Sequence, residues 1–439
     1  MSEFMTKESN IKIAVHNYRA IQRADIGING ITVVTGENGC GKSTLSKILY
    51  YIFKISSSYN LLVAENLKER LNGVIRFMDI AVRDLRSADR GLRKELMNDL
   101  DNLNDRLINS VPSQDTLQNL LYQLDRVHLL FNLDGGEANK MQYRRLLFVA
   151  NDILGIDVSV DHDNRLPIEK LKVKVSEIFD SSFKLLRSRN TFLLKNELEK
   201  IFHTDELPKK LDVLEIDQTL LSLRDNKLSI PYSIQNTIYI DTPMMLGEYS
   251  DDNPHWNDLN AMLSSNKYVN ANDYITNIIK KEILKGDVKY DDDIIASMNF
   301  SFSRLEDGKV FDLLDCATGI KSFSILQMLL KLGYIDSKTL LIFDEPESNL
   351  HPQWIVEYAR IIVLINKYIG AKFFIATHNP DFISAIRYIS EKEKTLSDVN
   401  FYLAERNGVS YTYRDLNNEI DPIFKSFNIA LDRIEKYGI

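Results

Sequence analysis

The chain has 439 residues, and 44% of them are hydrophobic, which suffices for two or three domains with a substantial core. Its formal net charge of −8 argues against a surface-wide basic coat for nucleic acid, so such contact needs a local basic stripe. The two cysteines, Cys40 and Cys316, exclude a disulfide framework and a CxxC zinc pair. No apolar run is long enough for a membrane span or a signal peptide, and we therefore expect a cytoplasmic protein.

The first chemical motif follows two predicted strands, residues 11–21 and 30–35, which the turn Asn29-Gly30 separates. The second strand leads into a glycine-rich loop and then into a helical apolar pattern. The loop reads Gly36, Glu37, Asn38, Gly39, Cys40, Gly41, Lys42, Ser43 and Thr44, which is the pattern GxxxxGK[ST] in its strand–loop–helix setting.

This loop predicts an ATP and Mg²⁺ site. Its glycines allow successive backbone N–H groups to face one anion, and the positive end of the following helix reinforces them. Lys42 would reach the β- and γ-phosphates, and the Ser43 hydroxyl would bind Mg²⁺. Cys40 is either a small loop residue or a redox-active one.

Residues 56–230 are rich in Leu, Lys, Glu, Asp and Asn with helical spacing. We therefore expect a discontinuous head, residues 1–55 and 231–439, which a mostly helical arm or cap interrupts. In the arm, arginines at spacings of three, four and three would lie on one helix face. This stripe consists of Arg83, Arg86, Arg90 and Arg93, with Lys94 beside them, and Lys184, Arg187 and Arg189 form a weaker cluster. Either set could contact nucleic acid or form a solvated face.

A second motif, TLLIFDEPESNLHP, occupies residues 339–352. An apolar run that ends in acids predicts a buried strand with carboxylates at its carboxyl end. Asp344 would hold the Mg²⁺ shell, and Glu345 would orient and deprotonate the attacking water.

Another apolar strand, residues 372–377, ends in His378. Alone, such a histidine often caps a helix or packs in the core. Because two successive strands end in acids and then in histidine, however, we expect both groups at one edge of one sheet, with His378 as a γ-phosphate sensor.

Between the glycine-rich loop and the Asp344 motif, the two halves of the predicted nucleotide site, lies a hairpin with the turn Asp307-Gly308. A loop and a helix that ends near Gly333 follow it. Thr318 and Gly319 stand where this helix begins. They suit the capping of a γ-phosphate held by a partner molecule, although a simple helix cap has the same pattern.

The order and spacing of these motifs resemble the ABC-type ATPase head of the SMC and OLD-nuclease group, including ATPase subunits of anti-phage systems such as Septu, PARIS and retron-associated modules. The resemblance covers roughly residues 11–55 and 296–425. It implies an α/β P-loop NTPase fold with a mixed sheet and a helical insertion, and hydrolysis of ATP to ADP and phosphate. It also implies that two copies clamp ATP between them, with residues 348–351 crossing the interface.

The chain departs from this family pattern in several places. Such heads usually offer a serine where Ala317 stands, so Thr318 would supply the hydroxyl. Gln235 is a candidate for the metal-sensing glutamine, and Arg19 resembles a basic element near the nucleotide. About 60 residues follow His378, too few for the nuclease domain of OLD proteins, so a nuclease would be a separate polypeptide.

These features favour a Mg-dependent ATPase that acts as a switch or sensor in anti-phage defence and controls a separate effector, such as a nuclease. A DNA repair or recombination ATPase that binds DNA through the insertion is the alternative, and a nucleotide-binding scaffold or transporter subunit is a third hypothesis. We expect a homodimer or higher oligomer and no membrane partner.

Overall fold

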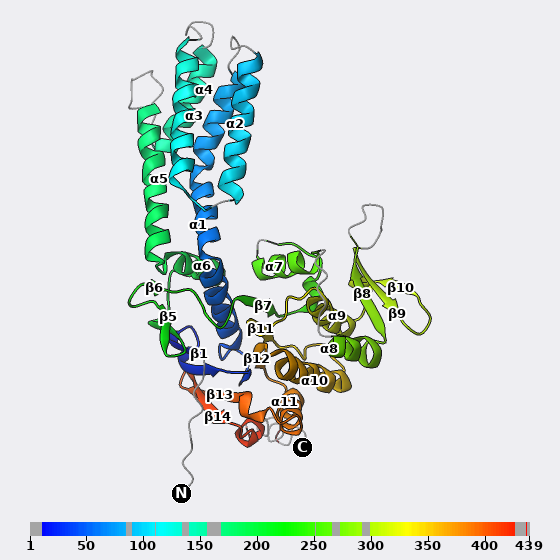
Figure 1. Cartoon of the computed structure of the whole chain (residues 1–439). Coiled ribbons are helices and arrows are strands. Elements are labelled where there is room, and N and C mark those ends of the chain that lie inside the picture. Colours follow the sequence, from blue (N-terminus) through cyan, green and yellow to red (C-terminus); the bar gives the residue numbers. More distant parts are fainter. Residues whose placement is uncertain are drawn as a thin grey trace. The chain divides into compact units, whose positions relative to one another are not determined.

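The computed structural model describes residues 11–84, 90–109, 111–133, 140–155, 168–250, 252–265, 273–291, 299–425 and 436 (Figure 1). The chain divides into two compact units. One consists of residues 1–57 and 191–439, and the other of residues 58–190. Below, the first is called the head and the second the helical unit.

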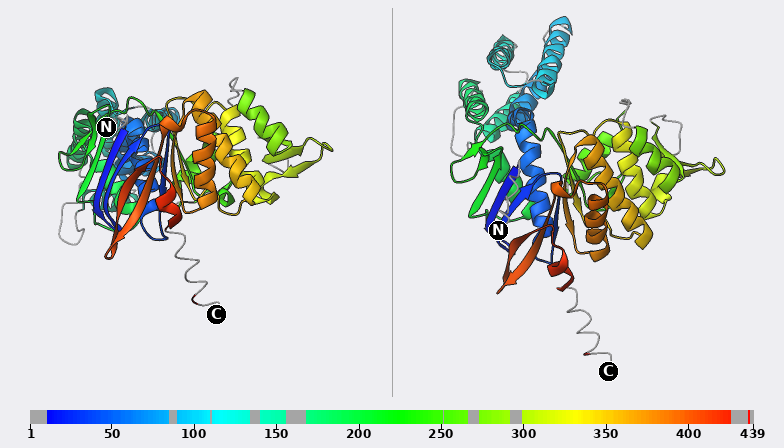
Figure 2. Two further views of the ribbon diagram at one scale, coloured as in Figure 1. Left: turned by 90° about the horizontal axis from the view of Figure 1, so that it is seen from below. Right: turned by 60° about the horizontal axis from the view of Figure 1, so that its bottom comes forward.

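An 11-stranded sheet forms the centre of the head. Its strands are β1 (Ile11–Tyr18), β2 (Ile21–Ile28), β3 (Ile31–Thr35), β4 (Lys210–Glu215), β5 (Gln218–Ser222), β6 (Lys227–Leu228), β7 (Asn236–Ile240), β11 (Thr339–Asp344), β12 (Lys372–Thr377), β13 (Val399–Asn407) and β14 (Ser410–Asn417). The spatial order is β6-β5-β4-β1-β2-β14-β13-β3-β12-β11-β7. Strands from the two ends of the sequence are therefore neighbours, as blue and orange-red strands show in Figure 2.

The strands from β13 to β7 run parallel, whereas β1, β2, β4, β5 and β6 form an antiparallel part. Every residue of β3 and β11 is buried, as expected for parallel strands with both faces covered. Thr35 pairs with Thr377, and Asp344 pairs with Ala376. The carboxyl ends of β3, β12 and β11 therefore lie at the same edge of the sheet.

Helices cover both faces of the parallel part. On one face, alternate strand residues such as Val33, Phe343 and Ile375 form a core with helices from α7 to α11. These helices are α7 (Pro254–Leu263), α8 (Asp273–Ile278), α9 (Thr318–Lys331), α10 (Pro352–Ile369) and α11 (Pro380–Lys392). The opposite face meets α1 (Lys42–Asp84), where Tyr50 contacts Tyr239. A small antiparallel sheet of β8 (Gly286–Tyr290), β9 (Phe300–Arg304) and β10 (Val310–Asp312) precedes α9.

Among its described residues, the helical unit contains the later part of α1 and the helices α2 to α5, which run alongside one another in Figure 1. They are α2 (Arg90–Asn109), α3 (Gln114–Leu133), α4 (Lys140–Leu154) and α5 (Ile168–Ser188). Apolar residues at helical spacing, among them Leu67, Phe77, Leu124 and Phe179, form its core.

The structure differs from the sequence-based expectation at three places. An additional strand, β2, lies between the two predicted N-terminal strands. Residues 191–230 belong to the head, because α6 (Phe192–Phe202) is followed by β4–β6, which extend the main sheet. The alternation of polar and apolar residues in KLDVLE is typical of a strand and could have predicted β4, but this region was predicted to be helical.

The described arginines of the predicted stripe belong to two helices rather than to one. Helix α1 ends at Asp84 and α2 begins at Arg90, while Arg86 lies outside the described residues. Arg189 of the weaker cluster lies over the ring of Tyr59, with its guanidinium carbon 4.6 Å from the ring centroid.

The predicted fold class is confirmed: the head is an α/β structure with a mixed sheet, a strand–loop–helix phosphate motif and a helical insertion. The hairpins at Gly308 and Gly408 also form as expected. Within the described ranges, none of the helices is both long and apolar enough to cross a bilayer.

Candidate active site

The glycine-rich loop connects β3 to α1, as predicted. Gly39 and Gly41 have φ values of +79° and +100°, a region that favours glycine. Lys42 is buried, and its Nζ donates hydrogen bonds to the carbonyl oxygens of Gly36 (2.9 Å) and Glu37 (3.1 Å). The ammonium group is therefore held over the loop that is predicted to bind phosphate.

The other loop residues differ in exposure. Glu37, Asn38, Gly39 and Ser43 are exposed, Gly36, Gly41 and Thr44 are half-buried, and Cys40 is fully buried. The carbonyl oxygen of Cys40 accepts a hydrogen bond from the Tyr413 hydroxyl (3.3 Å). This packing favours the interpretation of Cys40 as a structural loop residue over a redox-active one.

Asp344 stands at the carboxyl end of β11 and is buried. Its Oδ2 accepts a hydrogen bond from the Tyr239 hydroxyl (3.2 Å), whereas its Oδ1 is buried and has no hydrogen-bond partner in the described part of the chain. Burial raises the pKa of Asp344, and the nearby hydroxyls of Ser43 and Tyr239 act in the opposite direction. Ser43 and Asp344, the two predicted metal ligands, thus lie together.

These groups fit a Mg²⁺ ion. Magnesium takes oxygen ligands, usually from one or two protein side chains, with phosphates and water completing the shell. A buried carboxylate oxygen without a partner is costly unless something binds it, and Oδ1 of Asp344 is such an atom. Burial also raises the pKa of Tyr239 well above its ordinary value, so its hydroxyl stays protonated and donates to Asp344.

Glu345 and His378 also come together. Glu345 has a φ of +52°, an uncommon conformation for a non-glycine residue, and its backbone N–H donates to the carbonyl of Ala376 (2.8 Å). The turn brings Oε1 of Glu345 to 3.1 Å from Nδ1 of His378. Both side chains are partly exposed at the edge of the sheet, where water can reach them.

Glu347 is a buried carboxylate that the sequence reasoning did not assign. Its Oε1 accepts hydrogen bonds from the Thr377 hydroxyl (2.6 Å) and from the backbone N–H of His378 (3.3 Å). Burial raises its pKa. Glu347 therefore joins the loop after β11 to the loop after β12, which carries His378. The segment Asp-Glu-Pro-Glu contains this signal, but only the fold shows which acid faces inwards.

Two further residues were missed: Tyr239 in β7 and Asp241 directly after it. Asp241 accepts hydrogen bonds from Nε2 of His255 (3.1 Å) and Nε1 of Trp256 (2.6 Å). Burial acts to raise its pKa, but these hydrogen bonds hold the pKa below the ordinary value. The segment NTIYIDTP, an apolar strand that ends in an acid, is the signal that could have found them.

Gln235, the candidate metal-sensing glutamine, lies elsewhere. Its backbone N–H donates to the carbonyl of Lys338 at the start of β7 and β11, which are parallel. Five residues of strand, at about 3.3 Å each, separate this end of the sheet from Asp344. Gln235 therefore cannot take part in the site, and Asp241 follows β7 at the correct end. Arg19 stacks on Phe202, 5.2 Å from the ring centroid.

The segment around Thr318 and Gly319, where a partner's γ-phosphate is predicted to bind, is called the signature loop, and it contacts other residues of its own chain. The Thr318 hydroxyl is 3.9 Å from Sδ of Met244, and a Cβ added to Gly319 would meet Trp354 at 2.5 Å and Leu350 at 3.3 Å. These neighbours lie outside the glycine-rich loop. His351, in the predicted interface loop 348–351, is exposed and caps α10 by accepting from the N–H of Gln353 (3.4 Å). The roles of these loops between two copies stay predictions.

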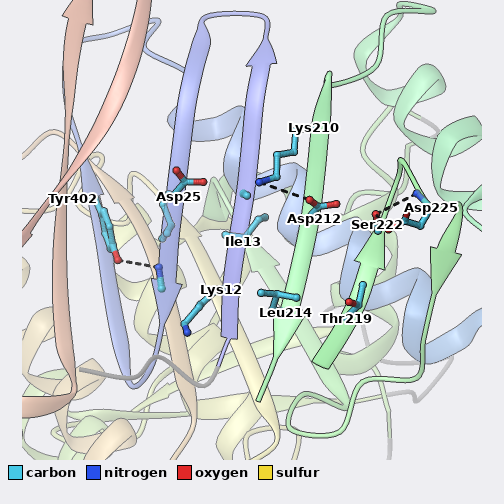
Figure 3. A pocket seen from close by; sticks show the side chains of 13 residues that line it. Lys12, Ile13, Asp25, Lys210, Asp212, Leu214, Thr219, Ser222, Asp225 and Tyr402 are labelled. Atoms are coloured by element: carbon cyan, nitrogen blue, oxygen red, sulfur yellow. Dashed lines mark hydrogen bonds and ion pairs between the residues drawn. The ribbon is translucent and has the colours of Figure 1, made fainter. Parts of the chain in front are cut away.

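A separate cavity of about 470 Å³ lies on the antiparallel part of the sheet (Figure 3). Its charged groups pair locally: Lys12 with Asp217, Lys210 with Asp212, and Asp25 with His16. Tyr402 lies at its border and accepts a hydrogen bond from the N–H of Gly27 (2.9 Å). None of the residues that line this cavity belongs to the glycine-rich loop.

The chain is also similar to known proteins. A family described as "AAA ATPase domain" matches residues 11–383, a range that includes the glycine-rich loop, Asp344 and His378. The comparison with curated proteins gives no match.

Among solved structures, the chain is similar to three SMC head structures. With the Smc head domain bound to the C-terminal domain of ScpA from Pyrococcus furiosus, identity is 10%, coverage is 97% of this chain and 98% of that chain, and the TM-score is 0.34. With the SmcHead bound to the C-winged helix domain of ScpA, identity is 8%, coverage is 94% of this chain and 98% of that chain, and the TM-score is 0.35. With the SMC head domain from Thermotoga maritima, identity is 10%, coverage is 92% of this chain and 98% of that chain, and the TM-score is 0.35.

The loop geometry makes a prediction about its glycines. In Gly41→Ala the new Cβ meets Cγ1 of Ile21 at 2.6 Å and φ is +100°, so we expect a loss of about 1–3 kcal/mol in unfolding free energy and weaker ATP binding. Gly39→Ala is the matched control for packing: it shares the strain of a positive φ (+79°), but its Cβ meets no described atom within 4 Å, so we expect a smaller loss. Urea unfolding and calorimetry with ATP measure both effects. Equal behaviour of the two variants would contradict the packing argument.

Proposed function

Because the chain belongs to the AAA ATPase domain family, we propose that it is a Mg-dependent enzyme that hydrolyses ATP to ADP and phosphate and dimerises when ATP is bound. One observation carries this proposal. Residues at the carboxyl ends of the parallel strands β11 and β12 and at the start of the helix after β3 converge at one sheet edge: Lys42 and Ser43, Asp344 and Glu345, and His378. Each of these groups has the chemistry that phosphoryl transfer to water needs.

The proposed roles follow from the contacts. The loop amides and Lys42 hold the β- and γ-phosphates, with Lys42 exchanging its carbonyl partners for phosphate oxygens. Ser43 and Asp344 would hold Mg²⁺, which supplies charge compensation on the phosphates when bound. Glu345 accepts the proton of the attacking water, and His378 orients Glu345 and contacts the γ-phosphate.

The dimer is proposed from the signature loop. Helix α9 begins at Thr318, and its first N–H groups can receive an anion. Near this helix start, Met244 and Leu314 are exposed apolar residues with 56% and 39% exposure, which suits a surface that a second copy covers. ATP held on one head and capped by the partner's α9 would give the dimer a higher affinity for ATP than the monomer has, as a switch requires.

Glu345→Gln tests the hydrolytic role. The amide cannot accept the water proton, so we expect ATP binding within a few-fold of wild type and turnover at least about 100-fold lower. Calorimetry and a phosphate-release assay measure the two quantities. Glu391→Gln is the control, because Glu391 is an exposed acid of α11 that pairs with Arg387. Turnover at the wild-type rate in Glu345→Gln would refute the assignment of the base.

Thr318→Glu tests the dimer. An acid in the first helical turn is favourable for the monomer, but it would repel the phosphates of the partner's ATP. In the non-hydrolysing Glu345→Gln background, we expect ATP to produce dimers in light scattering and Thr318→Glu to abolish them. Thr318→Ser keeps the hydroxyl and should still dimerise. ATP-dependent dimers that persist in Thr318→Glu would contradict this interface.

We further propose that this cytoplasmic switch controls a separately encoded effector, a nuclease, in bacterial anti-phage defence. The motif order from the glycine-rich loop to Ser-x-Leu-His-Pro and His378, together with a compact helical unit inserted into the head, supports this role. A helical insertion whose ends both join the head can respond to nucleotide binding there.

Phage plating tests the defence role. Cells that express this chain with its neighbouring genes should lower the plating efficiency of sensitive phages, and Glu345→Gln should change that protection. Unchanged plating, together with salt-dependent DNA binding that an Arg83/Arg86/Arg90 alanine variant abolishes, would instead favour the DNA repair hypothesis.

A further inference from the structure

Tyr239 is the only polar side chain of β7 that hydrogen-bonds to Asp344 among the described residues. It is 1% exposed, and its hydroxyl donates to Oδ2 of Asp344 at 3.2 Å. In the parallel register Tyr239 pairs with Ile342, so its side chain leaves the sheet on the same face as Asp344. The bond therefore links two adjacent strands on the face that α1 covers.

The ring of Tyr239 is itself held in place. The His255 ring lies 4.6 Å from it, centroid to centroid, and the Tyr50 ring lies 5.8 Å from it. Nε2 of His255 is 3.1 Å from Oδ2 of Asp241, two residues after Tyr239. Asp241 also accepts hydrogen bonds from Trp256 (2.6 Å) and from the N–H of Thr242 (2.7 Å).

This arrangement has a direct consequence for Asp344. A carboxylate can rotate about its last bond, and a fixed donor on one oxygen selects one orientation. Oδ2 is occupied by Tyr239, while Oδ1 is buried without a partner, and Ser43 lies beside the carboxylate. The free oxygen is thus the one that remains for a metal ion.

We propose that Tyr239 is the positioning residue of the metal site: it fixes Oδ2 of Asp344 so that Oδ1 binds Mg²⁺, and the pair Asp241–His255 holds Tyr239 in place. This inference rests on the proposed Mg-ATPase function and names the residues that tune its metal affinity. Neither Tyr239 nor Asp241 is proposed to contact the nucleotide itself.

Tyr239→Phe tests the proposal, because it removes only the hydroxyl. Loss of an outer-shell partner of a metal ligand lowers metal affinity by about 10- to 100-fold. We expect Mn²⁺, used as the probe with a non-hydrolysable ATP analogue, to bind about tenfold more weakly in electron paramagnetic resonance titrations. The Mg²⁺ concentration for half-maximal ATPase activity should rise similarly, while kcat at saturating Mg²⁺ and metal-free nucleotide binding stay near wild type.

Tyr358→Phe is the matched control. Tyr358 is another fully buried tyrosine next to β11, but its ring packs on Phe343, on the opposite face of the strand. This variant should leave Mn²⁺ affinity unchanged, and thermal unfolding of both variants shows that the head is folded. Asp241→Asn should weaken Mn²⁺ binding less than Tyr239→Phe does, because Asp241 acts on Asp344 through His255 and through its charge and does not hydrogen-bond to it.

Two outcomes would overturn the inference. Mn²⁺ affinity in Tyr239→Phe equal to that of Tyr358→Phe would show that the hydroxyl does not position the ligand. A larger loss of Mn²⁺ affinity in Asp241→Asn than in Tyr239→Phe would show that Asp241 controls the metal affinity more than the Tyr239 hydroxyl does. If the wild-type protein binds no Mn²⁺-nucleotide, the proposed Mg-ATPase function fails. That result can be told apart from the two outcomes above, because both of them require binding to wild type.

Discussion

The parallel pairing of β7, β11, β12 and β3 is the constraint on which the rest of the structure depends. Hydrogen bonds in this register align the carboxyl ends of the strands, so that loops distant in sequence meet at one edge. Strand β3 delivers the glycine-rich loop, β11 delivers Asp344, and β12 delivers His378. A slip of one residue in β11 would move Asp344 to the other face and separate it from Ser43.

The same edge concentrates buried polar atoms that the protein alone does not satisfy. Thr35 Oγ1, Asp344 Oδ1 and Glu347 Oε2 are buried and have no hydrogen-bond partner among the described residues. Each such group costs about 1–3 kcal/mol unless a ligand or water binds it. Three of them, at the carboxyl ends of β3 and β11 and in the loop after β11, indicate an edge that is built to receive a polar ligand, as an ATPase family member requires.

Sequence patterns predicted the parts of this edge that local chemistry specifies. The loop before Lys42 needs glycine for its positive φ values, and buried strands need continuous apolar runs. Both features could therefore be predicted from the sequence. Tyr239, Asp241 and Glu347 were missed: acids after apolar strands mark them as candidates, but only the neighbouring strands show which groups face the site. Gln235 was misassigned for the same reason, since the direction of β7 relative to β11 decides which end faces the site.

A polar layer between α1 and β7 extends the site beyond its ligands. Tyr50 packs against Tyr239, and both the Tyr50 hydroxyl and the Lys54 ammonium contact the carboxylate of Asp258 on α7. Helix α1 begins at Lys42, at the end that is proposed to bind phosphate, and Tyr50 of the same helix packs against Tyr239, the donor to Asp344. Because packed interiors transmit displacement, a shift of α1 when Lys42 exchanges loop carbonyls for phosphate would reach Tyr239 and, through it, the proposed metal ligand. Phosphate binding and metal affinity in this head should therefore be coupled rather than independent.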